Sequence, residues 1–94
     1  MKIIWLLSAR RQLEEILEYI SADSPQAAER YVDELFDRAN EMLEFPEIGT
    51  VYNVSGKKTV RKLVLDSHKF ILYRKTEDAI LILNLRDART DWKK

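Results

Sequence analysis

The sequence predicts one α+β domain spanning residues 1–94, in the order strand, helix, helix and then three or four strands. Two observations predict this fold. Apolar residues recur at helical spacing through the first half of the chain, whereas from residue 50 onward they alternate with polar residues as in strands. Short, turn-rich connections join the later segments and are typical of antiparallel neighbours. We therefore expect a hairpin of helices on one face of a small, mostly antiparallel sheet.

The chain opens on a segment rich in β-branched and aromatic residues. Residues 2–7 predict a strand that is buried on both faces. Ser8 is placed to cap a helix over residues 9–22. The apolar residues of that helix recur at helical intervals, which predicts one buried stripe made of Leu13, Ile16, Leu17 and Ile20.

A second helix, over residues 25–44, follows after a very short connection. Ser24 is placed to cap it, and Pro25 suits its first turn, where the missing N–H would have no partner. The helix ends before Pro46, because the residue preceding a proline is pushed out of helical geometry. Two helices joined so closely should run antiparallel as a hairpin. Their inward residues on the second helix are Ala28, Tyr31, Val32, Leu35, Ala39, Met42 and Leu43.

The second half predicts a meander of strands over residues 50–54, 59–65, 69–75 and 79–86. The position of the first strand in this sheet stays open. Regular alternation would place three sets of side chains on common faces. These sets are Arg61 with Leu63 and Leu65, Phe70 with Leu72 and Arg74, and Ile80 with Ile82, Asn84 and Arg86.

The composition excludes several classes of site. The chain has no cysteine and one histidine, which excludes disulfides, a thiolate nucleophile and a cysteine-based or multi-histidine metal site. We therefore expect neither a metal nor a cofactor. The longest apolar runs are too short to span a bilayer, so we expect no membrane partner. The absence of a targeting segment favours a cytoplasmic protein.

The formal net charge of zero conceals two halves of opposite charge. Residues 1–54 carry a net charge of −6, and residues 55–94 carry +6. The second helix also presents an acidic row made of Glu29, Asp33, Asp37 and Glu41. Such a row is either a docking surface for a basic partner or, more commonly, a solvated face. The single histidine, His68, falls in a turn, where a surface position is expected.

Arginines of the sheet half lie near the ends of the predicted strands. If the meander gathers them on its uncovered face, they form an anion site, because arginine binds phosphate or carboxylate through two parallel bonds. Arginines that merely keep the sheet edges soluble are an equally good interpretation. The residues in question are Arg61, Arg74, Arg86 and Arg89.

Several short motifs follow one another along nearly the whole chain. They are Ser8-Ala9 with Leu13, Ile16, Tyr19 and Ile20, SPQAA at 24–28, FPEIG at 45–49 after Leu43, VRKL at 60–63, ILYR at 71–74 and ILIL at 80–83. In this order and spacing the chain resembles the RelE/ParE superfamily of toxins from bacterial toxin–antitoxin pairs. That resemblance implies the RelE/ParE-like order β-α-α-β-β-β(-β), which agrees with the fold expected from the residues.

The resemblance implies a growth-inhibiting toxin that a cognate antitoxin neutralises in a hetero-oligomeric complex. RelE-like members resemble nucleases that cut mRNA on the ribosome, whereas ParE-like members poison DNA gyrase without a comparable catalytic set. The long helical hairpin with its SPQAA turn resembles the second group, so we expect DNA gyrase as the target and the ribosome with its mRNA as the alternative. A degenerate member acting only as an interaction module is a further alternative. If an antitoxin segment covers the basic half, it should be acidic there.

The nuclease alternative would place basic residues around the scissile phosphate. Cleavage through the 2′-hydroxyl needs a base, an acid and cations that stabilise the phosphate charge. The candidates are Arg61, Arg74, Arg86 and Arg89, with Lys57, Lys58 and Glu47 as weaker ones. Where several nuclease members carry a histidine near the last strand and a tyrosine in the tail, this chain has Arg86 or Asp87 and, farther on, Trp92.

Overall fold

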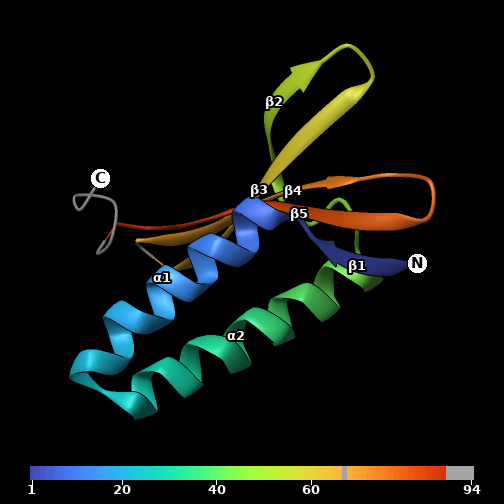
Figure 1. Cartoon of the computed structure of the whole chain (residues 1–94). Coiled ribbons are helices and arrows are strands. Elements are labelled where there is room, and N and C mark those ends of the chain that lie inside the picture. The colour runs from blue at the N-terminus through green and yellow to red at the C-terminus, as the bar shows by residue number, and fades with distance from the viewer. Residues whose placement is uncertain (67, 89–94) are drawn as a thin grey trace.

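The computed structural model describes residues 1–66 and 68–88, and it confirms the predicted α+β fold. The elements are β1 (Lys2–Trp5), α1 (Leu7–Asp23), α2 (Pro25–Glu44), β2 (Thr50–Ser55), β3 (Lys58–Asp66), β4 (Lys69–Lys75) and β5 (Ala79–Asp87). The two helices form an antiparallel hairpin that lies along one side of the sheet (Figure 1). Neither helix has a stretch long and apolar enough to cross a membrane, within the residues described.

The sheet has the strand order β1-β5-β4-β3-β2. Strands β2 to β5 form the predicted antiparallel meander, and β1 joins it at an edge, parallel to β5, with Lys2 opposite Ala79. The expectation that the first strand is buried on both faces is wrong. Lys2 and Ile4 are exposed, because an edge strand beside a helical hairpin is covered on one face only. The other face of β1 is the covered one, where Ile3 and Trp5 pack against the core.

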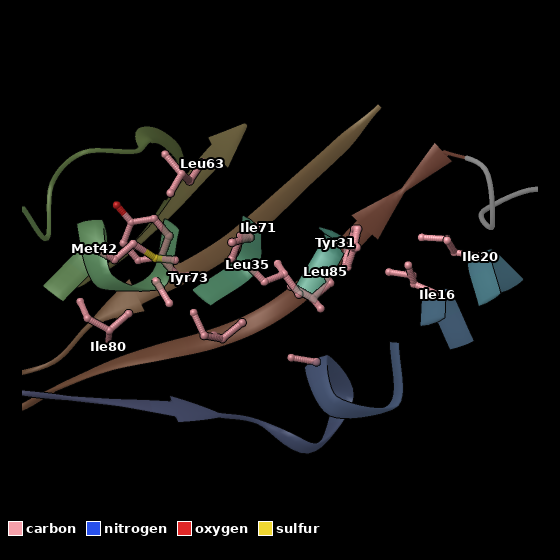
Figure 2. Close-up of a cluster of buried hydrophobic side chains, with 13 residues drawn as sticks. Ile16, Ile20, Tyr31, Leu35, Met42, Leu63, Ile71, Tyr73, Ile80 and Leu85 are labelled. Carbon is pink, nitrogen blue, oxygen red and sulfur yellow. The ribbon is translucent and has the colours of Figure 1, made fainter. Parts of the chain in front are cut away.

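The hydrophobic core lies between the helical hairpin and the sheet (Figure 2). Helix α1 contributes Ile16 and Ile20 of its predicted stripe, while Leu13 and Leu17 are partly buried at its margin. Helix α2 and the sheet supply most of the remaining buried residues, which are Tyr31, Leu35, Ala39, Met42, Leu63, Ile71, Tyr73, Ile80, Ile82 and Leu85. The helical period read from the sequence therefore identifies the buried faces of both helices.

Of the two predicted helix caps, one is confirmed and one is wrong. The Oγ of Ser24 accepts a hydrogen bond from the backbone N–H of Ala27 at 3.2 Å, with Pro25 in the first turn of α2. Helix α1, however, begins at Leu7, and its N-cap residue Leu6 makes no side-chain capping bond. Ser8 lies inside the helix, and its hydroxyl donates to the carbonyl of Leu83 at 2.7 Å. Ser8 therefore ties α1 to the sheet.

Strand β5 contains an irregularity that alternation could not reveal. Leu72 of β4 pairs with Asn84 and the next residue, Tyr73, pairs with Ile82, so Leu83 has no partner in the register with β4. The extra residue reverses the alternation, as bulges do. Both Ile82, which precedes the extra residue, and Leu85, which follows it, face the helices. The prediction that Ile82 and Arg86 share a face is therefore wrong.

Helix α1 supplies the hydrogen bonds that the irregular part of β5 requires. The backbone N–H of Leu85 donates to Oε1 of Gln12 at 2.7 Å, and Nε2 of Gln12 donates to Oδ1 of Asn84 at 2.9 Å. The bond from Ser8 to the Leu83 carbonyl lies one helical turn earlier. A bulge leaves backbone groups without ladder partners, and buried groups of that kind are costly unless they are satisfied. Two polar residues of α1 thus hold the shift in place.

The hairpin of β2 and β3 extends away from the helices (Figure 1). It turns through Gly56 and Lys57, with Gly56 at φ 61°, a conformation that glycine adopts without strain. All six residues of β2 are exposed. This end of the sheet therefore presents an edge strand.

Candidate functional site

The structure divides the candidate arginines between the two faces of the sheet. Arg61 lies opposite Tyr73 in the register of β3 and β4, so it shares the face that the helices cover. Arg74 follows Tyr73 directly and therefore points to the opposite, uncovered face, which we call the open face. Arg86 lies opposite Phe70, also on the open face. Arg89 and Trp92 lie outside the described residues. The structure thus does not bring Arg61 together with Arg74 and Arg86.

Arg61 instead fixes the turn that follows α2. Its Nη1 donates to the carbonyl of Gly49 at 2.9 Å. The hydroxyl of Tyr73 accepts from the N–H of Gly49 at 2.9 Å and donates to the carbonyl of Pro46 at 3.0 Å. A Cβ on Gly49 would lie 2.9 Å from both the Lys62 carbonyl oxygen and Cε1 of Tyr73. The FPEIG motif is thus explained by a turn that passes closely over two strands.

Burial and neighbouring groups shift the pKa of the Tyr73 hydroxyl. Desolvation raises its pKa, while the N–H of Gly49 and the charge of Arg61 lower it and the charge of Glu47 raises it, with a net increase. The phenol is consequently neutral at physiological pH and keeps the proton that it donates to Pro46. Its role is to hold the turn in place.

The open face carries a cavity of about 280 Å³, which we call the open-face pocket. Its lining residues are Lys62, Val64, Asp66, His68, Phe70, Arg86 and Ala88. The Nζ of Lys62 lies 4.4 Å from the centroid of the Phe70 ring, and Arg86 pairs with Phe70 from the other side in the strand register. Cationic side chains can bind a phosphate, and an aromatic ring beside them can stack on a nucleic-acid base. Arg86 is the predicted site residue that this pocket contains.

A pair of titratable groups lies at the rim of the open-face pocket. The backbone N–H of His68 donates to Oδ1 of Asp66 at 2.9 Å, and Nδ1 of His68 lies 3.4 Å from the same oxygen. Desolvation raises the pKa of Asp66, but the N–H of His68 and the ammonium of Lys69 outweigh it, so the net pKa is lowered. Asp66 is therefore ionised at neutral pH.

Lys69 does not join this pocket, although it contacts Asp66. Its Nζ lies 3.1 Å from Oδ2 of Asp66 and 2.9 Å from Oε1 of Glu34 on α2, and 4.9 Å from the Tyr31 ring centroid. Desolvation lowers the pKa of Lys69, but the carboxylates of Glu34 and Asp66 raise it by a larger amount, so the net pKa is raised. The cation thus connects the helical hairpin to the sheet and stays charged.

The weaker candidates lie elsewhere. Lys57 and Lys58 are exposed at the tip of the β2–β3 hairpin. Glu47 lines a separate cavity of about 550 Å³ below the end of α2, together with the exposed Phe45 and with Lys75. Asp87 is fully buried opposite Lys69, away from the open face. Among residues 1–66 and 68–88, no cluster of histidine and carboxylate side chains could hold a metal ion.

The sequence model of the family described as "ParE toxin of type II toxin-antitoxin system, parDE" matches residues 3–92. The chain belongs to the ParE toxin family. Toxin Y4kP from Sinorhizobium fredii is 35% identical over 92 residues, covering 97% of this chain and 92% of that protein. Toxin RelE2 from Caulobacter vibrioides is 30% identical over 87 residues, covering 93% of this chain and 94% of that protein.

Two solved structures share the fold of this ParE-family toxin. A chain of the chromosomal ParDE system from P. aeruginosa superposes with a TM-score of 0.72 at 22% identity, over 93% of this chain and 95% of that one. The YoeB/ParE toxin from Agrobacterium tumefaciens gives a TM-score of 0.57 at 17% identity, over 93% and 98% of the two chains. As a toxin of a type II toxin–antitoxin system, this ParE-family chain has an antitoxin as its partner.

Of the residues that line the open-face pocket in this ParE-family toxin, Lys62, His68 and Phe70 are not among the site residues predicted from the sequence. Alternation places Phe70 on a strand face, Lys62 belongs to the VRKL motif among the basic residues of the sheet half, and His68 is expected at the surface of a turn. The sequence does indicate the turn that contains His68. Because Val64 pairs with Phe70, this turn places His68 beside both β3 and β4. Finding the pocket from sequence therefore required the register of β3 and β4.

Proposed function

We propose that this toxin inhibits growth by binding DNA gyrase and poisoning it, without cutting RNA. The supporting observation is the placement of the titratable groups among the described residues. In RNA cleavage the base that activates the 2′-hydroxyl and the acid that protonates the leaving oxygen act at opposite ends of the reacting phosphate. His68 and Asp66 lie side by side 3.4 Å apart, and Arg61 is held by Gly49 on the other face. His68 and Asp66 therefore do not form an acid and a base on opposite sides of a phosphate.

Tightly induced expression tests this proposal. We expect early arrest of DNA synthesis with a DNA-damage response, measured by thymidine incorporation and a damage-inducible reporter, before leucine incorporation falls. Purified toxin should increase the amount of plasmid DNA trapped in covalent complexes with gyrase. Immediate loss of translation with cleaved mRNA would contradict gyrase poisoning. The proposed target places the toxin in the cytoplasm.

A second candidate function is ribosome-dependent cleavage of mRNA, and the open-face pocket favours it. Lys62, Arg86 and His68 surround Phe70 there, so a phosphate and a stacked base would both find partners. In this function Arg86 stabilises phosphate charge, whereas Arg74 lies on the same face opposite Leu81, outside the pocket. His68→Ala and Arg86→Ala would then each abolish mRNA cleavage in a translation extract, mapped by primer extension. Full toxicity of both variants would reject the nuclease function.

We further propose that the antitoxin covers the basic half of the toxin with an acidic segment, in a hetero-oligomeric complex. The β2–β3 hairpin carries Lys57, Lys58, Arg61 and Lys62 against a single acidic residue, Asp66, at the end far from its tip. Its β2 edge exposes three apolar side chains by more than half, namely Val51, Tyr52 and Val54. A segment that supplies both apolar anchors and carboxylates fits this surface. If induced expression causes no growth defect at all, the chain is instead an interaction module.

A further inference from the structure

A trough runs between the two helices on the surface of the helical hairpin. Its volume is about 380 Å³, and no residue of the sheet lines it. We call this feature the hairpin trough, and its lining residues are Leu17, Glu18 and Ser21 of α1 and Ala28, Glu29, Val32 and Asp33 of α2. It is separate from the open-face pocket, which is lined by residues of the sheet half alone.

The hairpin trough has an apolar floor. Leu17, Ala28 and Val32 are each only partly buried, so the contact between the two helices does not bury them completely. One turn beyond Val32 on α2, the Phe36 side chain is 58% exposed. Because residues four apart lie on the same side of a helix, Phe36 extends the apolar row of Ala28 and Val32. An exposed apolar row of this kind is typical of a protein-binding surface.

The rim of the trough is acidic and lacks cationic partners. Glu18, Glu29 and Asp33 form no ion pair with any residue of the described ranges, whereas Glu34 and Glu41 pair with Lys69 and Arg38. Two acids four residues apart on a helix, such as Glu29 and Asp33, repel each other and destabilise it slightly. Helices α1 and α2, over residues 7–44, hold ten acidic side chains against four arginines. The helical hairpin therefore has an excess of negative charge, which a basic partner would complement.

We propose that the hairpin trough binds a basic amphipathic helix of a partner protein. The apolar residues of that helix lie on Leu17, Val32 and Phe36, and its lysines and arginines face the acidic rim. A helix fits better than a strand, because the trough is bounded by the side chains of two helices and offers no unpaired backbone edge. Apolar anchors at helical spacing match the row along α2. This proposal is independent of whether gyrase or the ribosome is the target.

Binding of a labelled model peptide to the full chain tests the proposal. The probe is a helix of about 15 residues with leucine at i, i+3, i+4 and i+7 and lysine elsewhere, and its counterpart carries glutamate in place of lysine. By fluorescence anisotropy we expect saturable binding of the lysine peptide only, weakening as salt rises. The double variant Glu29→Lys, Asp33→Lys should weaken binding at least about tenfold. Val32→Asn should weaken it as well, because it removes apolar contact.

The matched control is the double variant Glu44→Lys, Glu77→Lys, which changes the net charge equally at exposed positions away from the trough and from Phe36. It should bind within about threefold of the unmodified chain, because charges outside the trough act only through screened solvent. Equal weakening by both double variants would mean attraction to net charge alone and would overturn the proposal. Self-association that Glu29→Lys, Asp33→Lys abolishes, seen by sedimentation, would also overturn it, because a second copy would then occupy the trough.

Discussion

At the scale of single residues, the turn after α2 shows how a motif can be structural. Gly49 passes so close to Tyr73 and Lys62 that a side chain has no room. The Tyr73 hydroxyl satisfies two backbone groups of the turn, and Arg61 satisfies a third. An arginine and a tyrosine that resemble functional residues in the sequence are therefore occupied in holding the chain.

The first prediction concerns the hydroxyl of Tyr73. Tyr73→Phe leaves the buried N–H of Gly49 without its acceptor, and an unsatisfied buried group costs about 1–3 kcal/mol. The free energy of unfolding, measured by urea denaturation, should fall by that amount. Tyr52→Phe is the matched control, since Tyr52 is 56% exposed, and should change stability by less than about 0.5 kcal/mol. Equal stabilities of the two variants would show that the turn does not depend on this hydroxyl.

The second prediction concerns the pH dependence contributed by Asp66. Its pKa is lowered in the folded chain from the ordinary 3.8, so the unfolded chain binds more protons as the pH falls through that region. The stabilisation by Asp66 is therefore complete at neutral pH and is lost as the pH drops from about 5 through the lowered pKa. Lys69, whose pKa is raised, loses its contribution only in strongly alkaline solution.

Asp66→Asn should remove this part of the acid dependence. Since the Asp66 side chain is 37% exposed, we expect a loss of no more than about 1 kcal/mol at pH 7 and a difference that shrinks toward zero in acid. Urea denaturation of both proteins between pH 7 and pH 3 provides the measurement. A constant gap between the two stabilities across that range would contradict an ionised, stabilising Asp66.

At the scale of elements, the shift in β5 decides which arginines can act together. It places Arg86 on the open face and leaves Ile82 and Leu85 both in the core. Helix α1 stabilises the shift through Ser8 and Gln12. A polar residue on the inner side of a helix thus controls the geometry of a neighbouring strand.

The third prediction tests that control. Gln12→Ala leaves the N–H of Leu85 without its acceptor and should lower the free energy of unfolding by about 1–3 kcal/mol. Gln26→Ala, at an exposed position in the first turn of α2, should change it by less than about 0.5 kcal/mol. Amide exchange at Leu85, followed by NMR, should accelerate in the Gln12 variant alone. Unchanged exchange there would show that the strand holds its shift without Gln12.

At the scale of the whole molecule, the charge split of the sequence becomes a spatial separation. Most acidic residues belong to the helical hairpin, and the β2–β3 hairpin with its cations extends away from the two helices (Figure 1). A molecule of this kind can bind partners of opposite charge on its two ends. We assign the acidic antitoxin segment to the basic end and a basic helix to the trough.

The fourth prediction concerns the salt dependence of antitoxin binding. If an acidic segment covers the β2–β3 hairpin, Lys57→Gln with Lys58→Gln should weaken antitoxin binding about two- to tenfold at low salt and reduce its decline with ionic strength. Arg10→Gln with Arg11→Gln, on α1, makes the same change in net charge and should have little effect. Isothermal titration calorimetry at several salt concentrations gives both affinities. The same effect from both pairs of substitutions would place the antitoxin elsewhere.

Much of the fold could be predicted because it depends on local patterns. Period and turn residues placed every strand and helix within two residues of its observed bounds, and Ser24 was identified as a cap from its neighbours alone. Ser8 was misread, because its hydroxyl bonds to a strand more than seventy residues away. The edge position of β1 was likewise undetermined, because parallel pairing with β5 depends on a contact between the two ends of the chain.

The sequence by itself determined the α+β class, the family and the opposite charges of the two halves, since these follow from composition, period and motif order. Tertiary structure alone decided which basic residues meet. One extra residue in β5 turns Arg86 toward Lys62 and His68, and one backbone carbonyl holds Arg61 on the other face. The physical reason is that a side chain's face depends on the parity of the register, and a single inserted residue reverses it.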